Sequence, residues 1–279
     1  NIKNEESLYS KLRAPFILYK EKINYERIGK STYNKKVYKI KNALQKQLDD
    51  SYEVYVGFLK DKYYIEESIF KIVNDGYNKI IIVPIVLSEN LDFYNLQKRV
   101  EGLKLFNLNI QIKYSEPLWN SEKIVESYKT KIRKQIDLDN LVDTGVILIG
   151  EGLESSEDLR IVNAIKQDLM FRKKIKNYLT KEVGLDDSKV RLCWYDNMEP
   201  DYLEEIKSLL EYGVGNIICV YTNPGATDIS NNVIAVNIKN RIELPEKVKI
   251  KVIDGFVYDT NLIYELKKKI EFINLQKWD

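Results

Sequence analysis

Short runs of β-branched and aromatic residues alternate with longer amphipathic stretches along the whole chain, and this alternation limits its fold more than any other feature. The first run is Pro15–Tyr19, and a stretch of helical period follows at Thr32–Leu48. Strands that alternate with helices form βαβ units, in which helices cover a parallel sheet. Further strands are predicted at Glu53–Leu59, Lys79–Val86 and Leu108–Tyr114, and further helices at Ile65–Asn74, Asn90–Leu103 and Glu122–Ile136. The sequence therefore predicts an α/β fold.

The same order of elements begins again in the second half of the chain. Gly76 and Gly213 each precede an apolar run and are 137 residues apart, as are Ile80 and Ile217. Constant offsets between matching elements indicate an internal duplication. The second set of strands is predicted at Val146–Ile149, Lys189–Trp194, Asn216–Tyr221 and Lys247–Ile253, and its helices at Ser156–Leu179, Tyr202–Glu211 and Asn261–Ile273.

We therefore expect two domains, residues 1–140 and 141–279, each with a four-stranded parallel sheet flanked by helices. The boundary falls in a polar stretch, Asp137–Thr144, between a helix and a strand. One segment of the second copy, residues 231–244, is rich in Val, Ile and Asn. It stays open between a strand, a distorted helix and a loop.

The composition excludes some classes of partner. With 44 basic and 42 acidic residues, the net charge of +2 gives no electrostatic footprint for nucleic acid. No apolar stretch approaches the ~20 residues of a membrane span. Cys193 and Cys219 lie inside apolar segments and are expected to be buried thiols. These features favour a cytoplasmic protein, although the start at Asn1 leaves an exported mature chain open, and an internal pair of domains can be monomeric.

Candidate site residues are those that follow the strands, because ligands of open parallel sheets bind beyond the carboxyl ends of the strands. Glu151 stands between two glycines, which allow the backbone to approach a ligand closely; the alternative is a solvated turn residue. Asp92 and Glu89 are alternatively carboxylates at a helix start, where the helix dipole stabilises them. The other residues at strand ends are Tyr19, Lys20, Asn90, Tyr221, Thr222, Asn223 and Asp228.

Three segments resemble the sirohydrochlorin chelatases and the related ferrochelatases. Tyr52–Phe93 is similar to the central segment of that superfamily, with a strand, a Glu-containing helix, a turn at glycine and an apolar strand that ends near proline. Ser115–Leu118 is similar to the end of its fourth strand, and Val146–Gly152 resembles its first strand. The resemblance implies two chelatase-like, flavodoxin-like domains that face each other across a cleft for a tetrapyrrole and a divalent metal such as Co²⁺ or Fe²⁺.

The chain contains no histidine, whereas the superfamily uses histidine and a carboxylate on the metal and the pyrrole protons. By resemblance, Lys20 and Glu151 stand at the position of one family histidine and Asn90 at that of another, with Asp92 in place of a glutamate. The resemblance therefore implies Glu151 and Asp92 as catalytic groups, and Glu151, Asp92 and Asp228 as metal ligands. The remaining strand-end residues (Lys20, Tyr19, Glu89, Asn90, Tyr221, Thr222 and Asn223) are expected to bind the substrate.

Three functions stay open at this point. The first is a degenerate relative of the chelatases that binds a tetrapyrrole or a divalent metal without rapid insertion. The second is an active chelatase that inserts Co²⁺ or Fe²⁺ with carboxylates. The third is a structural or partner-binding protein whose cleft has closed. The lack of imidazole, which binds first-row metals and accepts protons near neutral pH, favours the first over the second.

Overall fold

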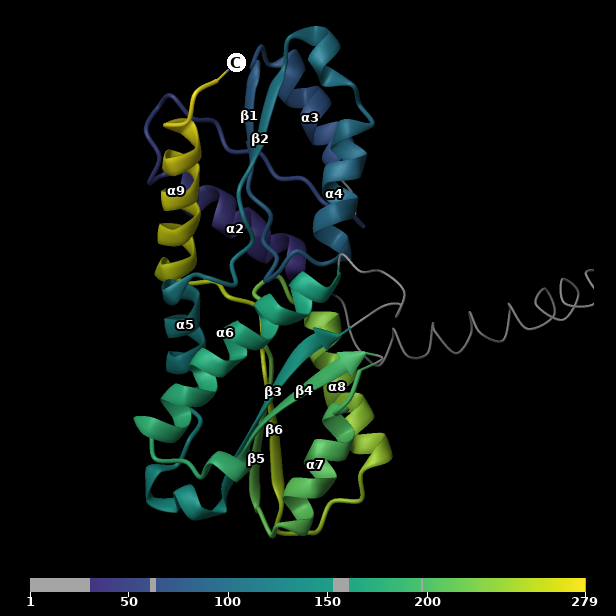
Figure 1. The fold of residues 1–279 in the computed structure, drawn as a ribbon, viewed down its shortest axis with the longest axis vertical. Helices are drawn as coiled ribbons and strands as arrows, with labels where there is room; N and C mark the ends of the chain where they lie inside the picture. The colour runs from purple at the N-terminus through teal and green to yellow at the C-terminus, as the bar shows by residue number, and fades with distance from the viewer. Residues whose placement is uncertain (1–30, 61–63, 153–160, 197, 279) are drawn as a thin grey trace, which may run out of the picture.

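The computed structural model describes residues 31–60, 64–152, 161–196 and 198–278. The fold is α/β, with parallel sheets and helices packed against them, as predicted (Figure 1). The first half contains α2 (Tyr33–Gln45), α3 (Ile65–Asn74), β1 (Lys79–Ile82), α4 (Leu91–Glu101), the 3₁₀ helix η1 (Leu105–Leu108), β2 (Gln111–Tyr114) and α5 (Glu122–Arg133). The second half contains η2 (Leu138–Asp143), β3 (Thr144–Gly152), α6 (Ile161–Lys181), η3 (Asp187–Lys189), β4 (Val190–Asp196), α7 (Tyr202–Glu211), β5 (Asn216–Tyr221), α8 (Asp228–Arg241), β6 (Lys249–Ile253) and α9 (Thr260–Asn274).

The sheet of the second half has four parallel strands in the order β4-β3-β5-β6. Its central strand β3 is bonded to β4 on one edge and to β5 on the other. Alternate residues of β3 face opposite layers, as the two-residue period of a strand requires. Val146 and Leu148 pack in a cluster with α5 and α6, while Ile147 and Ile149 pack in another with α7 and α8. Residues 144–150 of β3 are therefore buried between two layers of helices, and 151 and 152 at its carboxyl end are partly exposed.

The described sheet of the first half contains two strands, β1 and β2, which pair in parallel. The strand predicted at Pro15–Tyr19 lies outside the described residues. The strand predicted at Glu53–Leu59 is wrong as a paired strand, because this segment forms no ladder with the described strands and makes one isolated bridge, Phe58 to Tyr64. In the second half, the edge strand β4 pairs with the central strand β3 alone.

The last helix of each half covers more than its own sheet. Helix α5 packs against α6 and α9, and α9 packs in turn against α2 and β1 of the first half. Figure 1 shows α9, in yellow, beside α2 and β1, with α5 and α6 on the same side of the second half. The chain thus returns to the first half after completing the second sheet.

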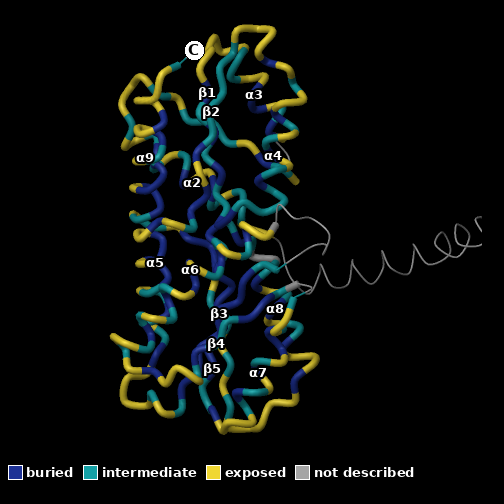
Figure 2. The backbone as a smooth tube through the Cα atoms, viewed as in Figure 1, coloured by how far each residue is buried: buried dark blue, intermediate teal, exposed yellow. Residues whose placement is uncertain are grey.

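One apolar cluster joins the two halves and runs along the middle of the molecule (Figure 2). It includes Ile40 of α2, Tyr128 of α5, Phe171 of α6 and Leu266 of α9. The Tyr128 hydroxyl, which is fully buried, donates to the backbone oxygen of Gly255 at 2.6 Å. Burial of each large apolar side chain contributes roughly 1.5–3 kcal/mol, so this shared cluster stabilises the two halves against each other.

The structure assigns the segment that the sequence left open. Residues 228–241 form helix α8, and Thr227 caps it by accepting from the backbone N–H of Ser230. Ile234 and Ile238 lie four residues apart and are buried on one face. Cys193 and Cys219 are free and buried, as predicted. Among the described residues, no helix is both long and apolar enough to cross a bilayer.

Candidate functional site

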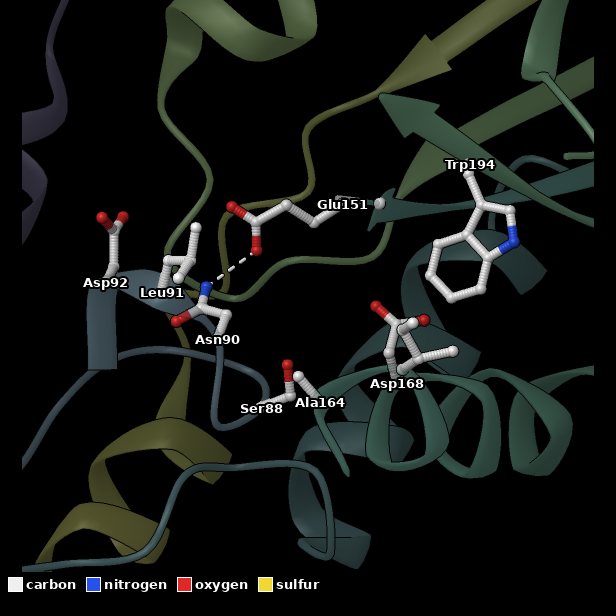
Figure 3. A pocket seen from close by; sticks show the side chains of 10 residues that line it. Ser88, Asn90, Leu91, Asp92, Glu151, Ala164, Asp168 and Trp194 are labelled. Carbon is white, nitrogen blue, oxygen red and sulfur yellow. Dashed lines mark hydrogen bonds between the residues drawn. The ribbon is translucent and has the colours of Figure 1, made fainter. Parts of the chain in front are cut away.

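A small pocket lies where the two halves meet, between the carboxyl end of β3, the start of α4 and helix α6 (Figure 3). Its volume is about 30 Å³, which is room for one water-sized group. The first half contributes the loop that leads into α4, and the second half contributes β3, α6 and the end of β4. The lining residues are Ser88, Asn90, Leu91, Asp92, Glu151, Gly152, Ala164, Ile165, Asp168 and Trp194.

Glu151 reaches the pocket from the carboxyl end of β3. The two positions beside it require glycine for different structural reasons. A Cβ atom at Gly150 would lie 2.5 Å from Nη2 of Arg172 and 2.8 Å from Oδ1 of Asp168, so no larger residue fits there. Gly152 has φ +89°, a conformation that side chains disfavour. Gly150 therefore leaves room for a buried ion pair, and Gly152 allows the backbone to turn. Neither role is the close approach to a ligand that we expected from the sequence.

Asn90 connects the two halves at the pocket. Its Nδ2 donates to Oε2 of Glu151 at 2.8 Å, the dashed line of Figure 3. Its Oδ1 accepts from the backbone N–H of Phe93 at 3.1 Å and so caps α4. The cap fixes which end of the amide faces Glu151, because oxygen is needed at the helix and only nitrogen can donate to the carboxylate. The amide thus presents a donor to Glu151.

Asp92 lies in the first turn of α4, where the helix dipole stabilises a negative charge. Its carboxylate is 3.0 Å from Nζ of Lys60. The side chain of Lys60 is 69% exposed and that of Asp92 is 31% exposed, so this pair is worth at most about 1 kcal/mol. Asp92 combines the helix-start role that we considered as the alternative with a place in the pocket wall.

Asp168 of α6 lines the pocket and forms an ion pair with Arg172, which was not singled out from the sequence. Nε of Arg172 donates to Asp168 Oδ1, and Nη1 donates to the backbone oxygens of Leu148 at 3.0 Å and Cys193 at 2.6 Å. The guanidinium carbon lies 4.1 Å from the centre of the Trp194 ring. Arg172 is completely buried, so this cation fastens the ends of β3 and β4 to α6.

The surroundings of Asp168 act on the pKa of its carboxyl in opposite directions, and the rise caused by burial is the largest effect. Burial raises the pKa of the Asp168 carboxyl, and the Arg172 charge, its hydrogen bond and the backbone N–H of Glu151 act against that rise. The sequence carried one signal for this pair, an Asp and an Arg four residues apart on a helix whose other buried residues include Phe171 and Ile175.

The pocket is rich in oxygen atoms and has no imidazole. Glu151, Asp92 and Asp168 supply carboxylates, and Asp92 and Asp168 each have a cationic partner. Within the described ranges, no group of three or more His, Cys, Asp or Glu side chains is arranged to hold a metal ion. Carboxylate oxygens of this kind suit hard cations.

The loop after β5 is bonded to β3 in the second half, and at Gly225 it also lies against the backbone of Ile85 in the first half. Tyr221 is buried, and burial, followed by the charge of Glu151, raises its pKa well above the usual range. The backbone N–H and the hydroxyl of Thr222 both donate to the Ile149 oxygen, at 2.8 and 2.9 Å. Asn223 Oδ1 accepts from Gly225 N–H at 2.9 Å. None of the three lines the small pocket.

The other predicted site residues lie elsewhere or outside the described part. The backbone N–H of Glu89 donates to Gln167 Oε1 at 2.8 Å, which joins the α4 loop to α6. Asp228 begins α8, and its side chain is outside the described part, as are Tyr19 and Lys20. The structure thus brings Asn90, Asp92 and Glu151 to one pocket. The catalytic, metal-binding and substrate-binding roles of all these residues stay predictions.

Comparisons with known proteins agree with the fold. The CbiX family model matches residues 29–135, which is less than half of the chain. The sirohydrochlorin chelatase SirB from Bacillus subtilis subspecies spizizenii, in complex with cobalt, superposes with a TM-score of 0.58 at 16% identity, over 85% of this chain and 87% of that chain. SirB from Bacillus subtilis with Fe³⁺ gives a TM-score of 0.58 at 15% identity, over 85% and 88%. No curated protein sequence matches the chain.

At these identities the two SirB structures show a shared fold, and the CbiX match adds a likeness in sequence over the first half. Both agree with the resemblance carried by Tyr52–Phe93. The chain therefore resembles the sirohydrochlorin chelatase superfamily, in fold over most of its length and in sequence over residues 29–135, with no histidine anywhere in it.

Proposed function

We propose that this chelatase-like protein binds a divalent metal ion or a tetrapyrrole at the pocket between its halves and does not insert the metal at an enzymatic rate. The observation that carries the proposal is the contact of Asn90 with Glu151 across the two halves. Both residues stand where the resemblance implies histidine. The cobalt in the named complex of SirB supports the choice of metal.

The side chains of the pocket are poorly suited to the proton transfers of metal insertion. As the metal enters a tetrapyrrole, a group must accept the pyrrole N–H protons. Histidine does this near pH 7, whereas a glutamate with an ordinary pKa of ~4.3 is a weak base. A general base is commonly worth ~10²–10⁴ in rate. The amide of Asn90 cannot replace it, because Asn90 already donates to Glu151 and does not titrate.

The size of the pocket decides which ligand enters first. About 30 Å³ accepts a bare ion or a water molecule. Pockets for larger organic ligands measure about 300–1,000 Å³, so a tetrapyrrole requires the two halves to separate at this point. The metal is therefore the first ligand expected, and tetrapyrrole binding depends on opening.

The same volume favours a second candidate, a structural or partner-binding protein whose cleft has closed. The two candidates differ in one respect that can be measured. A ligand-binding protein retains affinity for Co²⁺ or a tetrapyrrole, whereas a closed protein has none. An active chelatase that uses carboxylates differs from both in its rate of metal insertion.

The test uses the purified full-length chain, the variant Glu151→Gln and the control variant Glu246→Gln. Glutamine retains the shape of Glu151 and removes its charge, and Glu246 is an exposed carboxylate distant in sequence from the pocket residues. Calorimetric titration measures Co²⁺ binding, absorbance in the Soret region measures binding of sirohydrochlorin and a porphyrin, and the same bands report metal insertion.

We expect Glu151→Gln to weaken Co²⁺ binding about tenfold or more and Glu246→Gln to leave it unchanged. Metal insertion by the wild type is expected at little above the protein-free rate. Rapid insertion that Glu151→Gln abolishes would instead identify an active chelatase. Failure to bind Co²⁺ and both tetrapyrroles would leave the structural or partner-binding candidate.

A further inference from the structure

The two halves meet differently on the two sides of the molecule. On one side α9 packs against α2 and β1, α5 packs against α6 and α9, and all four helices contribute to the shared apolar cluster. On the other side, where α4 begins, the loop before α4 is bonded to the second half (Figure 1). Asn90 donates to Glu151, and the backbone N–H of Glu89 donates to Gln167, both at 2.8 Å. A hydrogen bond contributes less to stability than burial of a large apolar side chain, so the pocket side is the easier one to open.

The amide of Asn90 is held at both of its ends. Its oxygen accepts from the backbone N–H of Phe93 and caps α4, while its nitrogen donates to Oε2 of Glu151. An amide binds a metal ion through its oxygen, and here the oxygen belongs to the cap. At this point the first half therefore presents N–H hydrogens, whose partial positive charge opposes an arriving cation.

The closed pocket has too little room for a divalent cation together with its ligands. Its volume of about 30 Å³ holds one water-sized group. Divalent cations in proteins take roughly four to eight ligands at about 2.0–2.6 Å, and hard ions usually keep several waters. Asp92 and Asp168 are engaged with Lys60 and Arg172, so waters must supply most of the other ligands. A bare ion can enter, but its remaining ligands fit only when Asn90 moves away from Glu151.

We propose that the Asn90–Glu151 hydrogen bond is a latch that closes the pocket, and that a divalent cation opens it by taking the Glu151 carboxylate as a ligand. The inference rests on the function proposed above and adds the order of its steps. The cation displaces the Asn90 amide, the loop before α4 moves away from β3, and a larger ligand then has access. Because coupling between two ligands is reciprocal, a tetrapyrrole that binds the open state raises the affinity for the cation by the same factor.

Support of the metal ligand is the rival role for Asn90. Hydrogen bonds to a ligating carboxylate often strengthen metal binding, and their loss commonly costs about 10–100-fold in affinity. In that role the hydrogen bond persists beside the bound cation. The small volume of the closed pocket favours displacement instead. The two roles predict opposite changes in cation affinity when the donor is removed.

A matched pair of serine variants distinguishes the two roles. Serine caps helices well but is too short to reach Glu151, so Asn90→Ser removes the latch and keeps the start of α4. Asn95→Ser makes the same exchange at an exposed position of α4. Calorimetric titration of the full-length chains with Co²⁺ measures the affinity. We expect Asn90→Ser to bind Co²⁺ about tenfold more tightly than the wild type, which matches the strength of a hydrogen bond to a charged group, and Asn95→Ser to bind as the wild type does.

The outcomes separate the latch from the proposed function. If the wild type binds Co²⁺ and Asn90→Ser binds it equally or more weakly, the latch is overturned and the proposed function stands. If Asn90→Ser binds Co²⁺ and the wild type does not, the latch is supported and the wild-type pocket is closed to metal, against the proposed function. If neither protein binds Co²⁺, both are overturned.

Hydrogen exchange on the wild type tests the opening without a variant. In the closed state Gln167 protects the backbone N–H of Glu89. A bound ligand normally slows exchange around its site, because it stabilises the folded state. We expect saturating Co²⁺ to speed exchange severalfold in peptides that cover residues 86–93 and not in peptides from α9. Unchanged or slower exchange in residues 86–93 with Co²⁺ bound would overturn the latch.

Discussion

The two sheets of this protein differ in their centre. The second has a central strand, β3, with partners on both edges and with Val146, Ile147, Leu148 and Ile149 completely buried. The first, in its described part, has β1 and β2 beside an apolar groove. In the second half the central strand also carries Glu151 to the pocket. A central strand therefore does two things at once, because the strand that completes the core also positions the site residue that follows it.

The helices around the two sheets are much more alike. Helices α3 and α7 each have 10 residues, and both are followed by a glycine with positive φ, Gly76 and Gly213, before the next strand. The pairs β1–β2 and β5–β6 are both parallel. These matching elements are what a duplication predicts, although the duplication itself stays a prediction.

The largest expected effect on stability comes from a substitution in α6, which we compare with α2 of the first half. Helix α6 buries the Arg172–Asp168 pair, whereas the buried residues of α2 are Val37, Ile40 and Leu44. Arg172→Met leaves the Asp168 carboxylate buried without its cation, and we expect a loss of ~3–5 kcal/mol in the free energy of unfolding, measured with urea.

The double variant Asp168→Leu/Arg172→Met removes both charges and is the control for this prediction. We expect it to recover most of the loss, because replacement of a buried pair by apolar residues is often close to neutral. If Arg172→Met alone unfolds with nearly wild-type free energy, the pair does not hold the ends of β3 and β4. The difference between α6 and α2 then contributes nothing to the stability of the protein.

A smaller effect compares matching positions of the two sheets directly. Ile217 of β5 is 1% exposed, and Ile80 of β1 is 6% exposed and lines the groove. Ile217→Ala and Ile80→Ala each remove a buried side chain, and we expect both to cost ~2–5 kcal/mol in urea unfolding. A cost for Ile80→Ala below about half that for Ile217→Ala would indicate that the groove is not filled to core density.

Much of the fold could be predicted from the sequence, because the spacing of apolar residues indicates which faces of helices and strands are buried. The runs Lys79–Val86 and Asn216–Tyr221 are apolar enough to identify strands covered on both faces. Residues 231–244 could not be assigned, because the β-branched and Asn residues of α8 have weak helix propensity. Its helix depends on the Thr227 cap and on burial of Ile234 and Ile238, which are tertiary effects. The packing of α9 against the first half could not be predicted, because no pattern within its own sequence indicates which half it contacts.

The site was less predictable, since contacts across the two halves have no sequence period. The strand-end rule identified Asn90, Asp92 and Glu151, which meet in one pocket. It also selected Thr222, whose hydrogen bonds to Ile149 hold the loop after β5 to β3. It could not identify Asp168, because a carboxylate on a helix normally faces solvent. Only the buried Arg172 four residues later makes its position tolerable.

The smallest expected effect concerns the ion pairs that hold the second helix of each half. In the first half, Arg99 of α4 donates two hydrogen bonds to Glu66 of α3, at 2.6 and 2.5 Å. In the second, Arg191 of β4 and Glu205 of α7 approach to 3.4 Å. The hydrogen bonds from Arg99, the largest cause, lower the pKa of Glu66. A carboxyl whose pKa is lower in the folded state stabilises the protein above its unfolded pKa of ~4.3, and this contribution disappears as the pH falls through the folded pKa.

We therefore expect Glu66→Gln to lower the free energy of unfolding at pH 7 by ~0.5–1 kcal/mol, since both side chains are about one-third exposed or less. The difference from wild type should shrink as the pH falls below ~4 and vanish when Glu66 is protonated in both states. Urea unfolding at pH 7 and at several acidic values measures this, with Glu67→Gln, an exposed neighbour on the same helix, as control. Glu205→Gln should have the smaller effect, because its pair is longer. A difference for Glu66→Gln that stays constant from pH 7 to pH 3 would mean that lost packing, and not the charge of the pair, joins α3 to α4.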